Sequence, residues 1–131
     1  MNEIIIPITK ICPEKARYTN RALPDINRIR LSVRYRLDTM NIFTGREEAR
    51  GYYLHASPEK EECGVISTVL GLGCKALLLE VPRRSKKREE EACRLADAMA
   101  PQLIAWCCDE YGLIVDSNAE NKFVDKEREH V

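Results

Sequence analysis

The sequence predicts an α+β domain with two layers, in which one long C-terminal helix packs on a mostly antiparallel sheet of about four strands. The chain before residue 82 consists of short segments that alternate between apolar and polar residues or run apolar, which is typical of strands. Residues 82–112 instead carry apolar residues at spacings of three and four, the pattern of an amphipathic helix. Such a helix buries its apolar seam on the apolar face of a sheet.

The 131 residues have the size of a single domain. We assign residues 1–115 to this domain, because all the segments with a sustained apolar pattern lie within them. Residues 116–131 are polar and lack such a pattern, which predicts a mobile C-terminal tail.

The clearest strand is "RIRLSVRYRL", residues 28–37. Its apolar residues alternate with four arginines, Arg28, Arg30, Arg34 and Arg36, which we call the arginine row. A period of two, with β-branched and aromatic residues, is typical of a strand with one buried face. The arginine row is therefore expected on the sheet face that the helix does not cover.

Three further segments of the N-terminal half are expected around this strand. Residues 3–8 form a short β-like run in which Pro7 indicates an edge or a terminus. Residues 50–56 alternate and predict a second strand, and the charged segment 57–62 predicts a turn after it.

The segments that follow favour a second hairpin. Residues 63–70 and 74–81 flank the loop "GLG", although the run "ALLLE" in the second segment also fits a helix. The letters "GLGCKA" match a dinucleotide-binding G-x-G-x-x-A, but that motif needs a helix to open there, and we expect a turn and no cofactor. Residues 113–115 predict one more short strand.

The helix has recognisable ends. Ser85 is the expected N-cap and Gly112 the expected residue after its C-terminus. Pro101 lies inside the pattern, so the helix should kink or break there. The expected apolar seam comprises Ala92, Leu95, Met99, Leu103 and Trp106.

The six cysteines predict free thiols in a cytoplasmic protein. The N-terminus does not resemble a signal peptide, and no apolar run approaches the length of a membrane span. No two cysteines have C-x-x-C spacing, and the only histidines are His55 and His130, so we expect no metal site.

The arginine row suggests nucleic-acid binding, because guanidinium groups bind phosphate oxygens in bidentate fashion. Tyr53 and His55 on the neighbouring strand are candidate stacking surfaces for bases. The alternative is a solvated or internally paired sheet face, with Glu59, Glu61 and Glu62 as cross-strand partners in surface ion pairs.

A second basic cluster lies where the helix begins and includes Arg83, Arg84, Lys86 and Lys87. Cations oppose the helix dipole at this end, and a bound anion would remove that conflict. The alternative is that Glu90 and Glu91 neutralise these lysines at i,i+4 within the helix.

These features favour a non-enzymatic binding domain, since no catalytic motif is present. Residues 1–46 hold nine Lys or Arg against four acids, and residues 47–131 hold twelve against seventeen. This asymmetry also fits a protein-interaction or homo-oligomerising domain, in which an exposed edge at residues 3–8 pairs with another chain. A third alternative is a thiol enzyme that pairs Cys63 with His55.

Overall fold

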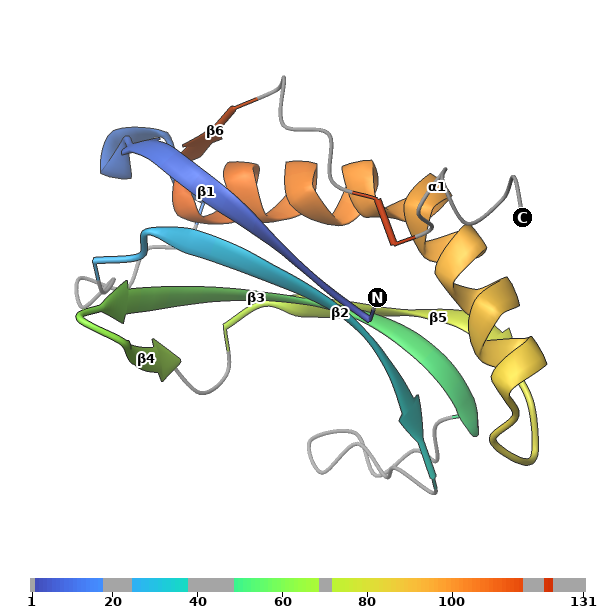
Figure 1. Cartoon of the computed structure of the whole chain (residues 1–131). Coiled ribbons are helices and arrows are strands. Elements are labelled where there is room, and N and C mark those ends of the chain that lie inside the picture. The colour runs from blue at the N-terminus through green and yellow to red at the C-terminus, as the bar shows by residue number, and fades with distance from the viewer. Residues whose placement is uncertain (1, 18–24, 38–48, 69–71, 117–121, 124–131) are drawn as a thin grey trace.

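The computed structural model describes residues 2–17, 25–37, 49–68, 72–116 and 122–123. The chain folds into two layers, with a helix lying across one face of an antiparallel sheet (Figure 1). This confirms the α+β prediction, but the sheet has six strands within the described residues, more than the four expected. The elements are β1 (Glu3–Ile11), the 3₁₀ turn η1 (Pro13–Lys15), β2 (Arg28–Arg36), β3 (Gly51–Glu62), β4 (Val65–Thr68), β5 (Cys74–Glu80), α1 (Lys86–Tyr111) and β6 (Leu113–Val115).

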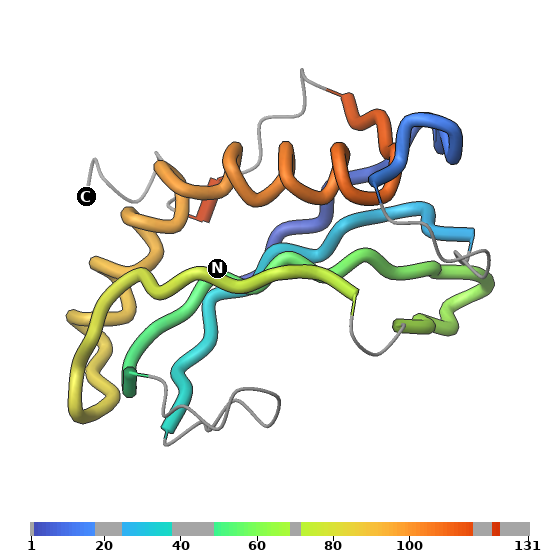
Figure 2. The backbone as a smooth tube through the Cα atoms, turned by 180° about the vertical axis from the view of Figure 1, so that it is seen from behind, coloured from blue at the N-terminus to red at the C-terminus, as the bar shows by residue number. Residues whose placement is uncertain are grey.

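The strands follow the order β4-β3-β2-β1-β6, and β5 also pairs with β3. The predicted hairpin of residues 63–70 with 74–81 is wrong, because β4 and β5 both pair with β3. They lie one after the other along that long strand, as Figure 2 shows. The prediction of a strand at 74–81 is confirmed, and the helical alternative is excluded.

The turn expected at residues 57–62 is also wrong, because β3 continues through it for 12 residues in all. Pro58 does not end the strand, and the strand pairing of the residues around it explains why. The pairing of β5 with β3 ends at Ala56, and the pairing of β4 begins at Glu59. On this edge of β3, Pro58 therefore lies between two ladders, where its missing N–H interrupts neither of them. On the other edge it is opposite Ile29 in the ladder with β2.

The core lies between the sheet and α1. On β2 the residues Ile29, Leu31 and Val33 are buried in it, at 0%, 1% and 5% exposure. The arginine row alternates with these residues, so its side chains leave β2 on the face away from α1, as predicted.

Helix α1 begins and ends as predicted. The Ser85 Oγ accepts a hydrogen bond from the Arg88 backbone N–H at 3.1 Å, and Gly112 closes the helix in the left-handed conformation with φ 65°. The helix stays continuous through Pro101. Its axis changes direction partway along, as Figure 1 shows, which agrees with the loss of one backbone donor.

The seam of α1 differs in part from the prediction. Leu95 is 41% exposed, and small residues dominate the buried side of the helix. Small side chains let the helix backbone approach the sheet closely, so that the bulk of the core comes from the strands. The buried helix residues are Ala92, Cys93, Ala96, Ala100, Leu103, Cys107 and Tyr111.

The expected C-terminal tail lies mostly outside the described residues. Among those described, Phe123 is 3% exposed and packs in the core. Its backbone N–H donates a hydrogen bond to Asp97 Oδ1 at 2.5 Å, which holds this part of the tail on α1. Within the described ranges, no helix is long and apolar enough to cross a lipid bilayer.

Candidate anion-binding site

Two of the four residues of the arginine row form ion pairs with one buried carboxylate. The register places Arg28 directly opposite Glu59 of β3. Glu59 Oε1 accepts hydrogen bonds from Arg28 Nε at 2.7 Å and from Arg30 Nε at 3.1 Å. The Glu59 side chain is 2% exposed, whereas the two arginine side chains keep 18% and 20% of their area in solvent.

Of the three acids expected as partners, Glu59 therefore pairs with the row, and the pair is buried and not on the surface. Glu62 pairs instead with Lys60, and the Glu61 carboxylate accepts a hydrogen bond from the Gly64 N–H.

Arg30 has a second acidic partner on the other side of β2. Its Nη1 lies 3.0 Å from Oε1 of Glu3 on β1. The hydrogen bond to Glu59 raises the pKa of Arg30, although partial burial opposes the rise. Arg28 and Arg30 therefore join three strands by charge pairing, which leaves less of their charge for an external anion.

The other half of the arginine row lies at the opposite end of β2. Arg34 is exposed and Arg36 is half-buried. Neither has an ion-pair partner among the residues that the structure describes. Their guanidinium groups remain available to a ligand.

The two candidate stacking residues lie on the same face as the row, since Tyr53 is opposite Arg34 and His55 is opposite Ser32. Tyr53 is only 6% exposed, and its hydroxyl donates a hydrogen bond to the Ala49 carbonyl at 2.5 Å. Its ring also contacts the ring of His55 edge-on at 6.5 Å between centroids. In this conformation a base has little access to the Tyr53 ring.

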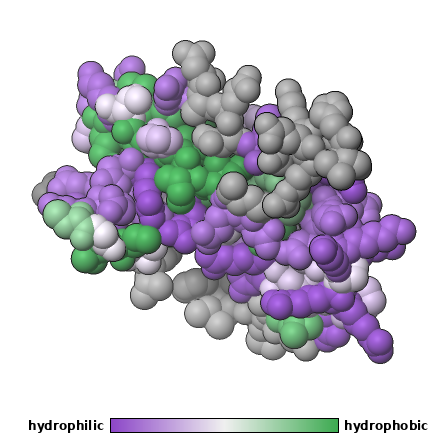
Figure 3. Space-filling model, viewed as in Figure 1, coloured by the Kyte–Doolittle hydropathy of each residue, from purple (hydrophilic) through white to green (hydrophobic). Residues whose placement is uncertain are grey.

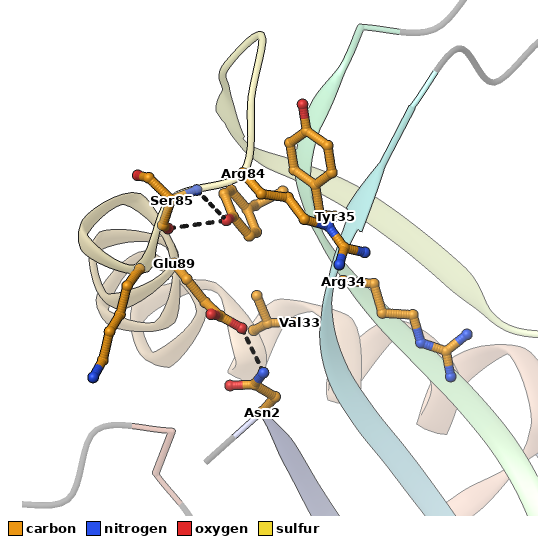
Figure 4. Close-up of a pocket in the computed structure, with 9 residues that line it drawn as sticks. Asn2, Val33, Arg34, Tyr35, Arg84, Ser85 and Glu89 are labelled. Atoms are coloured by element: carbon orange, nitrogen blue, oxygen red, sulfur yellow. Dashed lines mark hydrogen bonds between the residues drawn. The ribbon is translucent and has the colours of Figure 1, made fainter.

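A cavity of about 800 Å³ opens between the end of β2 and the start of α1 (Figure 4). Three cations line it, Arg34 from β2, Arg84 from the loop before the helix, and Lys86 from the first turn; we call them the basic rim. The remaining lining residues are Asn2, Val33, Tyr35, Tyr52, Ser85 and Glu89. Residues from both predicted basic clusters thus meet at one site.

Two tyrosines hold the loop before α1 in place. The Tyr52 hydroxyl donates to the Ser85 carbonyl at 3.1 Å and accepts from the Ser85 N–H at 3.2 Å. The Tyr35 hydroxyl donates to the Val81 carbonyl at 3.1 Å. The guanidinium of Arg84 lies 5.5 Å from the centre of the Tyr35 ring, a cation–π contact that orients it toward β2.

The helix does not neutralise its own first cations in the way the alternative predicted. The ion pair found in this turn joins Arg88 Nη1 to Glu91 at 2.8 Å. Lys86 and Lys87 have no ion-pair partner within the described part of the chain. Glu89 also lines the cavity, where its Oε1 accepts a hydrogen bond from Asn2 Nδ2 at 2.5 Å. Three cations and one carboxylate therefore line the cavity.

Arg36, Arg83 and Lys87 lie outside the cavity lining, although each is within two residues of a member of the basic rim. Sequence analysis missed Tyr35 and Tyr52 as site residues, because their place in the alternating pattern assigns them to the core face. Their rings contact each other edge-on at 5.0 Å. The sequence feature that could have identified them is the position of the two tyrosines near the ends of two adjacent strands.

The pair expected for a thiol enzyme is not formed. His55 and Cys63 stand at positions separated by most of β3, which at the rise of an extended strand is roughly 20 Å or more. Cys63 is exposed in the turn after β3, and the six cysteines are free. No three His, Cys, Asp or Glu side chains gather as metal ligands in the part of the chain that the structure describes.

Comparison of this chain with protein-family models, with curated proteins and with solved structures found no match. The function is therefore inferred from the residues and their geometry.

Proposed function

We propose that this domain binds the phosphate backbone of nucleic acid at the basic rim, with Arg36, Arg83 and Lys87 as neighbouring cations. The observation that carries the proposal is that Arg34, Arg84 and Lys86 all line one cavity. These three cations have no ion-pair partner among the described residues, unlike Arg28 and Arg30. Unpaired guanidinium and ammonium groups are the groups that neutralise phosphates.

The direction of the side chains favours an extended polyanion over a single anion. Arg84 reaches toward β2, while Arg34 leaves that strand on the side opposite Val33 (Figure 4). The two guanidinium groups point in different directions, which suits successive phosphates of a strand better than a single phosphate. The first turn of α1 adds its positive dipole end beside Lys86. Contacts of this kind position a backbone and read little sequence.

The test is the salt dependence of binding to a labelled single-stranded oligonucleotide, followed by fluorescence anisotropy. We expect the Arg34→Ala/Arg84→Ala variant to bind about tenfold more weakly at low salt. The slope of log affinity against log salt should become about 1.4 less steep, since each phosphate contact on a single strand contributes about 0.7.

Arg94→Ala is the matched control, because Arg94 is an exposed arginine on α1 outside the cavity lining. This variant should keep the affinity and slope of the unchanged protein. The proposal is wrong if the unchanged protein does not bind at low salt, or if Arg94→Ala weakens binding as much as the rim variant.

A second candidate function is self-association through the outer edge of the sheet. Among the described strands, β5 pairs only with β3, so its other side offers backbone groups to a strand of a second copy. Apolar side chains are exposed beside this edge, Leu77 at 39%, Val65 at 65% and Ile66 at 47%. Figure 3 shows hydrophobic side chains at the left over β4, and a hydrophilic surface over the start of α1 at lower right. The edge expected at residues 3–8 is a poorer candidate, because β2 pairs with it on one side and Pro7 lies within it.

Light scattering at high micromolar concentration tests this second candidate. We expect a dimer or larger species that Leu77→Lys converts to a monomer, because a buried charge at the edge opposes pairing. Leu95→Lys is the control, since Leu95 on α1 has nearly the same exposure, 41%. A monomeric unchanged protein at this concentration excludes self-association.

A further inference from the structure

The cavity at the basic rim is larger and more varied in its lining than phosphate binding requires. Its volume of about 800 Å³ lies within the roughly 300–1,000 Å³ that is typical of sites for whole small molecules. Val33 and the rings of Tyr35 and Tyr52 add apolar surface to the lining. A phosphate makes no use of an apolar wall, whereas a nucleobase packs against one. The lining therefore suits a base together with the phosphates of its strand.

Glu89 is the lining residue that a site for phosphate alone does not explain. It is a half-buried carboxylate beside three cations, and a carboxylate repels phosphate oxygens. Its Oε1 accepts a hydrogen bond from Asn2 Nδ2 at 2.5 Å, and Oε2 accepts none from the residues that the structure describes. Figure 4 shows the Glu89 side chain turned toward Asn2. The carboxylate is thus left with acceptor capacity for a ligand group that carries N–H donors.

Asn2 and Glu89 together present a donor beside two acceptors. The Asn2 amide nitrogen carries two N–H groups, and one of them is used by Glu89. A carboxylate receives two parallel N–H groups on its two oxygens, as it does from the fork of an arginine. The Watson–Crick edge of guanine is the complement of this row, with the O6 acceptor next to the N1–H and N2–H donors. Adenine, cytosine and thymine each have only one donor group at that edge.

We infer that the cavity takes a guanine base of the bound strand, and that Glu89 and Asn2 pair with its Watson–Crick edge. The inference rests on the proposed function, because phosphates on the basic rim hold the strand in place. It adds the base that the site selects, whereas phosphate contacts read little sequence.

Arg84 supplies the stacking surface for this base. Its guanidinium lies 5.5 Å from the centre of the Tyr35 ring, and Tyr52 contacts that ring edge-on at 5.0 Å. Arg84 is exposed, so the face of its guanidinium away from Tyr35 is open to a flat ring. Bases stack on guanidinium planes in this way. The N–H groups at the edge of the same guanidinium stay available to a phosphate.

The experiment measures fluorescence anisotropy with three labelled DNA strands that differ at one central position. Each strand is otherwise all thymine, and the central base is guanine, hypoxanthine or adenine. We expect the guanine strand to bind about tenfold more tightly than the adenine strand, as one bidentate base contact allows. Hypoxanthine keeps O6 and N1–H but lacks the N2 amino group, so its affinity should lie between the other two.

Glu89→Gln should remove the preference for guanine, because the amide offers one acceptor and places a donor against the second N–H. Its affinity for the adenine strand should not fall, since a negative charge beside the phosphates is lost. Glu90→Gln is the matched control, because Glu90 is the next residue of α1, is exposed and lies outside the cavity lining. This variant should keep the tenfold ratio. Each ratio compares strands on one variant, so a general loss of folded protein does not change it.

The outcomes separate guanine selection from phosphate binding. If the unchanged protein binds the three strands equally and with a steep salt slope, the proposed function holds and guanine selection is wrong. Guanine selection is also wrong if Glu89→Gln keeps the preference, or if Glu90→Gln loses as much of it. If no strand binds at low salt, the proposed function fails and this inference fails with it.

Discussion

Replacing Glu59 with glutamine is expected to lower the free energy of unfolding by about 3 kcal/mol. The amide preserves the volume of the side chain but leaves two guanidinium groups facing a neutral partner. Removing one member of a buried ion pair costs about 3–5 kcal/mol. The lower end applies here, because Arg28 and Arg30 keep 18% and 20% of their side-chain area in solvent. Arg30 also retains Glu3 at 3.0 Å.

Urea denaturation of Glu59→Gln and Glu62→Gln measures this difference. Glu62 is the same residue type on the same strand, but it is 70% exposed and pairs with Lys60 at 3.2 Å. A surface pair of this kind contributes less than about 1 kcal/mol. If the two variants lost the same free energy of unfolding, burial of the Glu59 carboxylate would add nothing to stability.

Substituting alanine for Gly112 is expected to cost about 2–5 kcal/mol, the sum of left-handed strain and overpacking. The backbone at Gly112 has φ +65°, which costs a non-glycine residue about 1–2 kcal/mol. A Cβ there would also lie 2.1 Å from the Cys12 carbonyl oxygen. That backbone cannot simply move away, because the Cys12 N–H donates to the Gly112 carbonyl at 2.6 Å.

Gly64→Ala is the matched control for this effect. Gly64 has φ +82°, but no heavy atom lies within 4 Å of the position that a Cβ would take there. Only the conformational strain applies, so the loss should be about 1 kcal/mol. Thermal unfolding of both variants gives the comparison, and a Gly112→Ala protein as stable as Gly64→Ala would mean that the contact with Cys12 relaxes without cost.

Local sequence patterns correctly predicted the features that depend on residues close together in the chain. The alternation in β2 predicted which of its faces is buried, and Ser85 and Gly112 predicted the ends of α1. The same kind of evidence failed at residues 57–62, where charged residues and Pro58 indicate a turn. There the strand continues because β2 pairs with it through Glu59 on one edge while β5 and β4 divide its other edge, which no local pattern contains.

The candidate site was predictable as two separate basic clusters but not as one cavity. Arg34 and Arg84 are 50 positions apart in the chain. Their meeting depends on the hydrogen bonds that Tyr52 makes to Ser85, which fix the start of α1 against β3.

The sequence by itself determined the fold class, the buried face of β2 and the presence of an arginine row, because these follow from side-chain periodicity within a few residues. Only the tertiary structure decided which arginines are engaged internally. Glu59 is 31 residues from Arg28 in the chain, and a shift of one residue in the pairing of β2 with β3 would turn its carboxylate to the other face of the sheet. The packing of the whole sheet against α1 sets this register. The register in turn divides the arginine row into one half that is paired with acidic residues and one half that stays available to a ligand.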